Sequence, residues 1–348
     1  MKKAFLWGLA ALFCANIFAQ EQKLLTLGLE ARGDYQREYV EEDVIAAGTG
    51  FKGKFLNLRL DGSIGENFSY SFRQRLNKDH RDDSFFDATD WLTLTYKKNN
   101  WEVSAGKQVV AIGGYEYDIA PIDLYFCSEW WQNIPCYQFG ASVGYALNDG
   151  KDKLLFQLCE SPWRVVTIED ANGDKVAVTQ DDMFAYNLMW TGSHGCLSTL
   201  WSLNMIEYLP GHFVNYISLG NRVDVGDVAF EFDFMNRATS GQAFFGKNYS
   251  AIGKVEWRAN EKLKFFGKAS YDVNDTATGK DMLVADGCDI TLVGAGVECF
   301  PLKDGSNDIR LHAAGAYSFG DSGSVLLDSQ TYLTVGVTWK MNLLSFKK

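Results

Sequence analysis

Short segments that alternate apolar with polar residues run through most of this 348-residue chain. In residues 228–234, valine and phenylalanine occupy every second position, and alanine, glutamate and aspartate lie between them. A period of two is typical of a β-strand with one face in an apolar environment and the other in a polar one. About sixteen such segments follow one another. After residue 19, no apolar run reaches the roughly 20 residues that a membrane-spanning helix needs. The alternation therefore predicts an all-β fold.

The beginning of the chain has the composition of an export signal. Met1 is followed by two lysines, and residues 4–18 are mostly apolar, with Ala19 as a suitable cleavage point. We expect residues 1–19 to be a signal peptide and residues 20–348 to form a single exported domain.

Short and long connections alternate along the predicted strands. Transmembrane barrels show this pattern, because their periplasmic turns are short and their outer loops are longer. The sequence therefore predicts a single antiparallel transmembrane barrel of about sixteen strands with both termini at the periplasmic end. The predicted short turns lie near 65–67, 97–100, 147–152, 191–195, 223–227, 259–262 and 301–308, and the longer loops near 40–53, 78–88, 110–136, 161–182, 206–212, 236–248, 274–288 and 319–329.

A soluble β-sandwich would also alternate, but it rarely uses so many strands in one unit. Tyrosine and tryptophan lie near many of the predicted strand ends, where a barrel carries its aromatic girdles. This distribution favours the membrane barrel. Those positions include Tyr70, Tyr96, Trp101, Trp257, Tyr271, Tyr317 and Trp339.

Composition and motifs argue against several other classes of protein. The net charge of −11 does not suggest a nucleic-acid partner. No CxxC pair, HExxH, P-loop or EF-hand pattern occurs, and none of the four histidines has an evident serine partner. We predict no catalytic activity, no metal site and no cofactor. Cys127 and Cys136 fall in one predicted loop, and the sequence leaves open whether they pair.

The longest connection between predicted strands, 110–136, is too apolar for a freely solvated loop. We expect it to fold into the lumen and to narrow it. Its candidate constriction residues are Tyr115, Glu116, Asp118 and Asp123.

Charged residues on the polar faces of the predicted strands would line a water-filled lumen. Arg59, Arg73 and Arg75 lie close together across one turn, and a second basic face on the later strands is offset by inward acids. Opposed basic and acidic walls and an anion-selective lumen are both compatible with this pattern. The candidate pore-lining residues are Arg59, Asp61, Arg73, Arg75, Glu102, Lys107, Lys254, Arg258 and Lys264.

Several stretches resemble the phosphate-selective porin O/P family of Gram-negative outer membranes. They are residues 58–62, 71–78, 85–91, 105–108, 232–237 and 339–342. The resemblance implies a sixteen-stranded barrel that assembles as a homotrimer in the outer-membrane bilayer and lets small hydrophilic solutes diffuse through. Family members that select phosphate use a ladder of arginines and a cluster of lysines. This chain offers Arg59, Arg73 and Arg75 on its early strands, but its overall charge is acidic and the loop at 110–136 carries acids rather than lysines. Two alternatives remain open: a channel selective for anions such as phosphate, and a plugged barrel that binds a partner through its outer loops.

Overall fold

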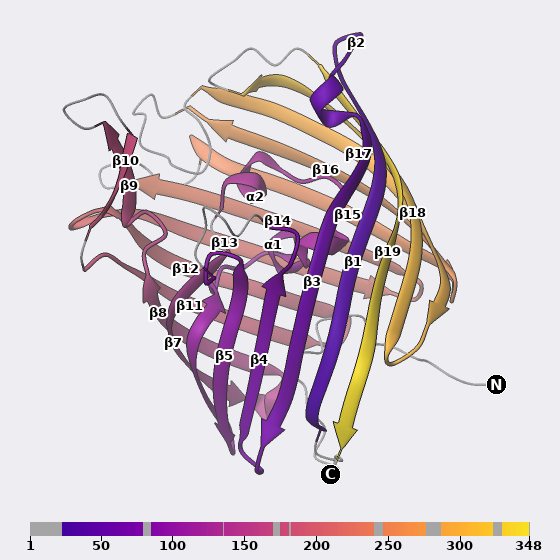
Figure 1. Cartoon of the computed structure of the whole chain (residues 1–348). Helices are drawn as coiled ribbons and strands as arrows, with labels where there is room; N and C mark the ends of the chain where they lie inside the picture. Colours follow the sequence, from indigo (N-terminus) through magenta and orange to yellow (C-terminus); the bar gives the residue numbers. More distant parts are fainter. Residues whose placement is uncertain are drawn as a thin grey trace.

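The computed structural model describes residues 23–78, 85–134, 136–169, 175–180, 182–239, 246–275, 287–322 and 329–347. The predicted signal peptide, 1–19, lies outside these residues. Sixteen long strands form one closed antiparallel barrel, as the sequence predicts (Figure 1). These strands are β1 (Lys23–Val40), β3 (Gly50–Ile64), β4 (Phe68–Arg75), β5 (Thr89–Lys98), β6 (Trp101–Val109), β7 (Tyr137–Leu147), β8 (Asp152–Glu160), β11 (Phe184–His194), β12 (Leu197–Leu209), β13 (His212–Val225), β14 (Val228–Thr239), β15 (Asn248–Asn260), β16 (Leu263–Asn274), β17 (Cys288–Lys303), β18 (Asn307–Ser322) and β19 (Gln330–Lys347).

The barrel closes between its first and last strands. Ala31 of β1 lies opposite Trp339 of β19 on one side and Leu56 of β3 on the other. β8 pairs directly with β11, because β9 (Val165–Glu169) and β10 (Lys175–Thr179) form a separate hairpin. The two-residue strand β2 (Asp43–Val44) pairs with the end of β1. Every long strand thus has two neighbours, so no barrel strand is left as an edge open to another chain.

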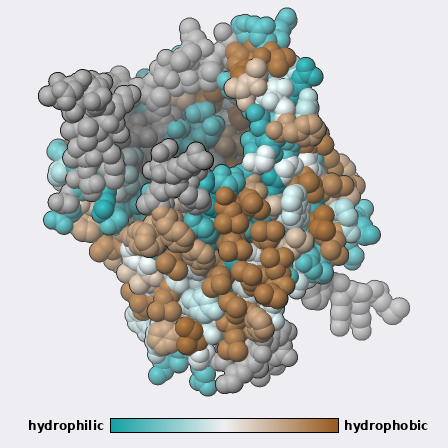
Figure 2. Space-filling view, viewed as in Figure 1, coloured by the Kyte–Doolittle hydropathy of each residue, from teal (hydrophilic) through white to brown (hydrophobic). Residues whose placement is uncertain are grey.

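The alternation in the sequence becomes an apolar outer face and a polar inner face. On β14, Phe230 and Phe232 are 51% and 52% exposed, whereas Glu231 and Asp233 between them are 9% and 2% exposed. Figure 2 shows the outer face covered by hydrophobic residues, with hydrophilic residues at the lower rim. An apolar outer face and a polar inner face suit a barrel with lipid outside and water inside.

The connections at the end of the barrel where β1 begins and β19 ends are short (Figure 1). Residues 65–67 and 226–227 are tight turns, as predicted. The prediction of a longer loop at 206–212 is wrong, because β12 continues to Leu209 and β13 begins at His212. Gly211 completes this two-residue turn with a φ of +74°, a conformation that residues with a Cβ rarely adopt.

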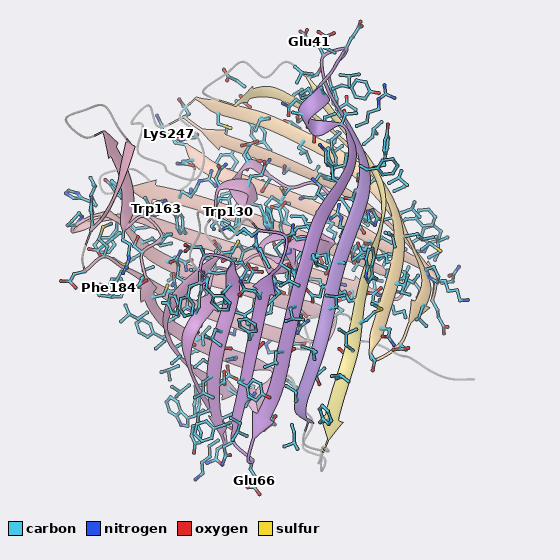
Figure 3. All side chains as sticks on the ribbon, viewed as in Figure 1. Glu41, Glu66, Trp130, Trp163, Phe184 and Lys247 are labelled. Atoms are coloured by element: carbon cyan, nitrogen blue, oxygen red, sulfur yellow. The ribbon has the colours of Figure 1, made fainter. Side chains whose placement is uncertain are left out.

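The largest apolar core of the described chain lies inside the barrel. Inward side chains such as Ile206, Val214 and Tyr216 pack there against Trp130 and Ile134 of the connection between β6 and β7. Trp130 is completely buried and lies within the ring of strands in Figure 3. The barrel interior is therefore filled on one side rather than hollow throughout.

Candidate functional site

The connection between β6 and β7, residues 110–136, packs against the inner face of the barrel wall; we call it the inner loop. All of it except residue 135 is described. It contains the short helices α1 (Tyr115–Asp118) and α2 (Glu129–Asn133) and the 3₁₀ turn η2 (Pro121–Asp123). None of the helices in the described chain is long and apolar enough to cross a membrane.

The inner loop starts along the wall through backbone hydrogen bonds. The N–H of Ala111 donates to Gln157 of β8 over 2.8 Å, and the N–H of Gly113 donates to Ser202 of β12 over 2.8 Å. Gly114 has a φ of +105°, and its Cα lies only 2.7 Å from where a Cβ on Gly220 would stand. The loop backbone can approach β12 and β13 this closely because glycine stands on both sides of the contact.

Two aspartates of the wall bind the N-termini of the two short helices. Asp233 of β14 accepts hydrogen bonds from the backbone N–H of Tyr115 at 2.8 Å and of Glu116 at 2.7 Å. Asp272 of β16 accepts the backbone N–H of Glu129 and Trp130, each at 3.3 Å. A carboxylate at this position satisfies N–H groups that a helix leaves without an internal partner. Both caps come from strands more than a hundred residues farther along the chain.

Ion pairs complete the attachment of the inner loop. Glu116 contacts Lys268 of β16 and also accepts the N–H and hydroxyl of Ser128. Asp123 lies 2.5 Å from both Arg310 of β18 and Lys340 of β19. Burial alone would raise the pKa of Asp123, but Lys340 and Arg310 outweigh it and hold that pKa well below its ordinary value. The inner loop is thus fixed across the wall from β8 to β19.

Tyr125 and Phe126 anchor the far end of the inner loop. The hydroxyl of Tyr125 donates to Glu298 of β17 over 2.7 Å, and its ring lies against His312 and Phe266. Phe126 packs in the same apolar cluster. The backbone carbonyls of Ile122 and Leu124 accept hydrogen bonds from Arg32 of β1, which brings the loop to the first strand.

Arg59, Arg73 and Arg75 form one basic surface on β3 and β4, which we call the arginine wall. Each guanidinium has a carboxylate partner: Arg59 lies 3.1 Å from both Glu30 and Asp61. Arg73 and Arg75 each contact Asp90 through Nε at 2.7 Å.

The three arginines differ in their access to the lumen. Arg73 is buried, stacks on Trp91 with 4.0 Å between the guanidinium carbon and the ring centre, and donates to the hydroxyl of Tyr137. The side chains of Arg59 and Arg75 are about one third exposed, at 34% and 33%. The structure therefore brings the three predicted arginines together and leaves two of them partly exposed.

A chain of alternating charges runs along the inner face of the barrel from β13 to β19. Arg222 and Lys254 both contact Glu231 of β14, which lies opposite them on the neighbouring strands. Lys264 of β16 lies opposite Glu298 of β17, 2.7 Å away. Five bases and five acids are connected in this network, so it has no net charge. Its bases are Arg222, Lys254, Lys264, Arg310 and Lys340, and its acids are Asp224, Glu231, Glu256, Glu298 and Asp123.

Two predicted lining residues have different positions from those we expected. Lys107 lies opposite Leu92 and Phe139, which are exposed on the outer face, because the alternation continues unbroken from Ala105. It is therefore not a lumen residue. Arg258 pairs with Lys264 in register but is exposed near the end of β15.

Glu102 is buried on the inner face, as predicted, and contacts two lysines. Lys97 lies 3.3 Å and Lys153 lies 2.6 Å from its carboxylate. Cys127 and Cys136 are both free thiols. Burial raises the pKa of Cys127 to about 12, so its thiol carries little reactive thiolate at neutral pH.

Sequence reasoning missed several residues that shape the interior. Asp90 and Asp272 lie close to the ends of β5 and β16, where the period of two is hard to follow. Asp90 lies 17 and 15 positions from its partners Arg73 and Arg75, so no local pattern in the sequence connects them. The residues missed are Asp90, Trp91, Tyr125, Asp272 and Glu298.

A closed sixteen-stranded barrel with an apolar outer face, a charged lumen and an inner loop is the architecture of an outer-membrane porin. The chain belongs to the phosphate-selective porin O and P family, whose sequence model matches residues 25–275. It is therefore a protein of the Gram-negative outer membrane that provides a channel for passive diffusion. No curated protein sequence matches it.

Three solved structures illustrate the shared fold. An anion-selective porin from Comamonas acidovorans is 13% identical, with 93% of this chain and 100% of that chain covered and a TM-score of 0.56. The outer membrane channel DcaP of Acinetobacter baumannii is 12% identical, with 90% of this chain and 96% of that chain covered and a TM-score of 0.59. The trimer form of OmpT from Vibrio cholerae is 13% identical, with 91% of this chain and 99% of that chain covered and a TM-score of 0.56.

Proposed function

We propose that small hydrophilic solutes pass between the inner loop and the arginine wall. The attachment of the inner loop to β8, β12, β14, β16, β18 and β19 carries this proposal, because the loop occupies that side of the interior, whereas Arg59 and Arg75 on β3 and β4 keep about one third of their side chains exposed. The loop then narrows the lumen, and selectivity follows from the width of the passage and the charges beside it.

Opposed charges border this passage. The arginine wall is on β3 and β4, and β13 and β14 lie eight strands away in either direction around the barrel. The α1 helix, with its carboxylates Glu116 and Asp118, is held against β14 by Asp233. Solutes would therefore pass between partly exposed arginines on one side and the carboxylate-bearing helix α1 on the other.

Conductance of the purified protein in a planar bilayer tests the channel. We expect stepwise currents that grow with salt concentration, and swelling of proteoliposomes in sugars that declines as the sugar becomes larger. A barrel that inserts fully but carries no current would contradict the proposal and favour the plugged, partner-binding alternative.

We also propose that the chain assembles as a homotrimer. A structural neighbour from Vibrio cholerae is described as a trimer form, and the apolar outer face seen in Figure 2 provides surface for contact between copies as well as with lipid. The mass of the detergent-solubilised protein, measured by light scattering with the detergent subtracted, tests this assembly; a monomer mass would exclude it.

Anion selectivity is the second candidate. The partial exposure of Arg59 and Arg75 favours it, and one structural neighbour is an anion-selective porin. The reversal potential across a salt gradient distinguishes anion from cation preference.

A further inference from the structure

The inner loop carries three carboxylates that the sequence marked as constriction residues, and the structure separates them. Glu116 is 3% exposed and is held by Lys268 and Ser128. Asp123 is 14% exposed and is shared by Arg310 and Lys340. The charges of these two acids are neutralised by the ion pairs that bind the loop to the wall.

Asp118 differs from both. Its side chain is exposed, although Tyr115, Glu116 and Tyr117 of the same helix are buried. Within the described part of the chain it makes no ion pair. Because α1 lies inside the barrel, this exposed carboxylate faces the water of the lumen.

The position of Asp118 is rigid enough to matter for passing ions. Asp233 caps the first turn of α1, and the pair formed by Glu116 with Lys268 holds the same turn to β16. The charged wall residue that acts on Asp118 is Glu231 of β14, and the charge of Glu231 is already balanced by Arg222 and Lys254. The field that a solute meets beside α1 is therefore that of an uncompensated negative charge.

The arginine wall does not supply an equal positive charge. Arg59 has two carboxylate neighbours, Glu30 and Asp61, and the side chain of Asp61 is itself 36% exposed. Arg73 and Arg75 share Asp90, and Arg73 also lies 3.9 Å from Glu30. Three arginines and three acids thus stand together without net charge, and a multivalent anion such as phosphate would meet carboxylates beside each guanidinium.

We propose that Asp118 makes the passage prefer cations, so that inorganic cations and small solutes with a protonated amine pass more readily than anions of the same size. This inference rests on the proposed passage beside the inner loop. It assigns the selectivity to Asp118. It also implies that the arginine wall does not act as an anion filter.

The test is the reversal potential in a tenfold gradient of potassium chloride, measured on the wild-type protein and on Asp118→Asn. We expect a preference for potassium that falls about two- to fivefold in Asp118→Asn, the size expected for one charge in water a few ångströms from the ion. Asparagine keeps the volume of the side chain, and because Asp118 is exposed and unpaired the variant should fold normally. Glu66→Gln is the matched control, because Glu66 is an exposed acid in the turn between β3 and β4 at the lower rim of the barrel (Figure 3); its ratio should equal that of the wild type.

Swelling of proteoliposomes in lysine and in glutamate gives an independent measurement with organic probes. Faster swelling in lysine, reduced in Asp118→Asn, would support the inference. A wild-type preference for chloride or glutamate, or a ratio unchanged by Asp118→Asn, would overturn it and leave the porin function intact. A complete absence of current in every variant would instead contradict the proposed passage.

Discussion

Glu116 of the inner loop and Lys268 of β16 form an ion pair that is almost fully enclosed, with 3% and 4% of their side chains exposed. The ammonium of Lys268 also donates to the carbonyl of Phe126 over 3.1 Å. Residues separated by 152 positions in the sequence therefore meet at one point inside the barrel. This pair joins both arms of the inner loop to a single strand of the wall.

Lys268→Met should destabilise the barrel by about 3–5 kcal/mol, because Glu116 would remain buried without its cation. Unfolding by urea in lipid vesicles measures this loss. The double variant Glu116→Gln, Lys268→Met removes both charges and should recover most of the stability. A double variant no more stable than Lys268→Met would show that the charge pair is not the source of the loss.

Replacement of Asp233 should loosen the inner loop without disturbing β14. In Asp233→Asn, one of the two accepting oxygens becomes a donor, so one of the bonds from Tyr115 and Glu116 is lost, at about 1–2 kcal/mol. Asp233→Leu loses both bonds and should cost more. We expect noisier single-channel currents in the order wild type, Asp233→Asn, Asp233→Leu. Equal noise in all three proteins would mean that the wall cap does not hold α1.

The barrel could be predicted from the sequence because its signal is local. The side chains of β14 alternate between lipid and lumen at neighbouring positions, and the same period of two recurs in strands such as β6, β8 and β12. Lys107 shows how the prediction of single residues fails. Residues 105–108 resemble the family, but the alternation that runs from Trp101 through Ala105 places Lys107 on the outer face, opposite Leu92.

The geometry of the inner loop could not be predicted in the same way. The acids of 110–136 were visible, but their partners are chosen by the closure of the barrel. Asp123 meets Arg310 across 187 residues, and Tyr115 meets Asp233 across 118. No pattern within the loop distinguishes Asp118, which is exposed, from Glu116 two residues earlier, which is buried.

The two arginines that share Asp90 should respond differently to the same substitution. Arg73 is 3% exposed and packs on Trp91, so Arg73→Met should cost about 3 kcal/mol or more through the loss of a buried pair and of the stacking contact. Arg75 is 33% exposed, and Arg75→Met should cost under about 1 kcal/mol, as is usual for pairs in contact with water. Urea midpoints of the two variants measure the difference. Similar losses in both would contradict the separation of a structural Arg73 from a solvent-facing Arg75.

Cation preference should depend on pH through Asp118. Enclosure by the barrel wall and the charge of Glu231 raise the pKa of this carboxyl to about 6. The groups that face it are Glu231 of β14 with its partner Arg222 of β13, and Glu116 on its own helix is held by Lys268. A raised pKa means that the carboxylate is charged above pH 6 and takes up a proton as the pH falls through 6. The preference for potassium should therefore be full near pH 7.5 and largely lost at pH 5.

The reversal potential measured across this range should show a transition near pH 6 in the wild type and none in Asp118→Asn. A transition that persists in Asp118→Asn would assign it to another group.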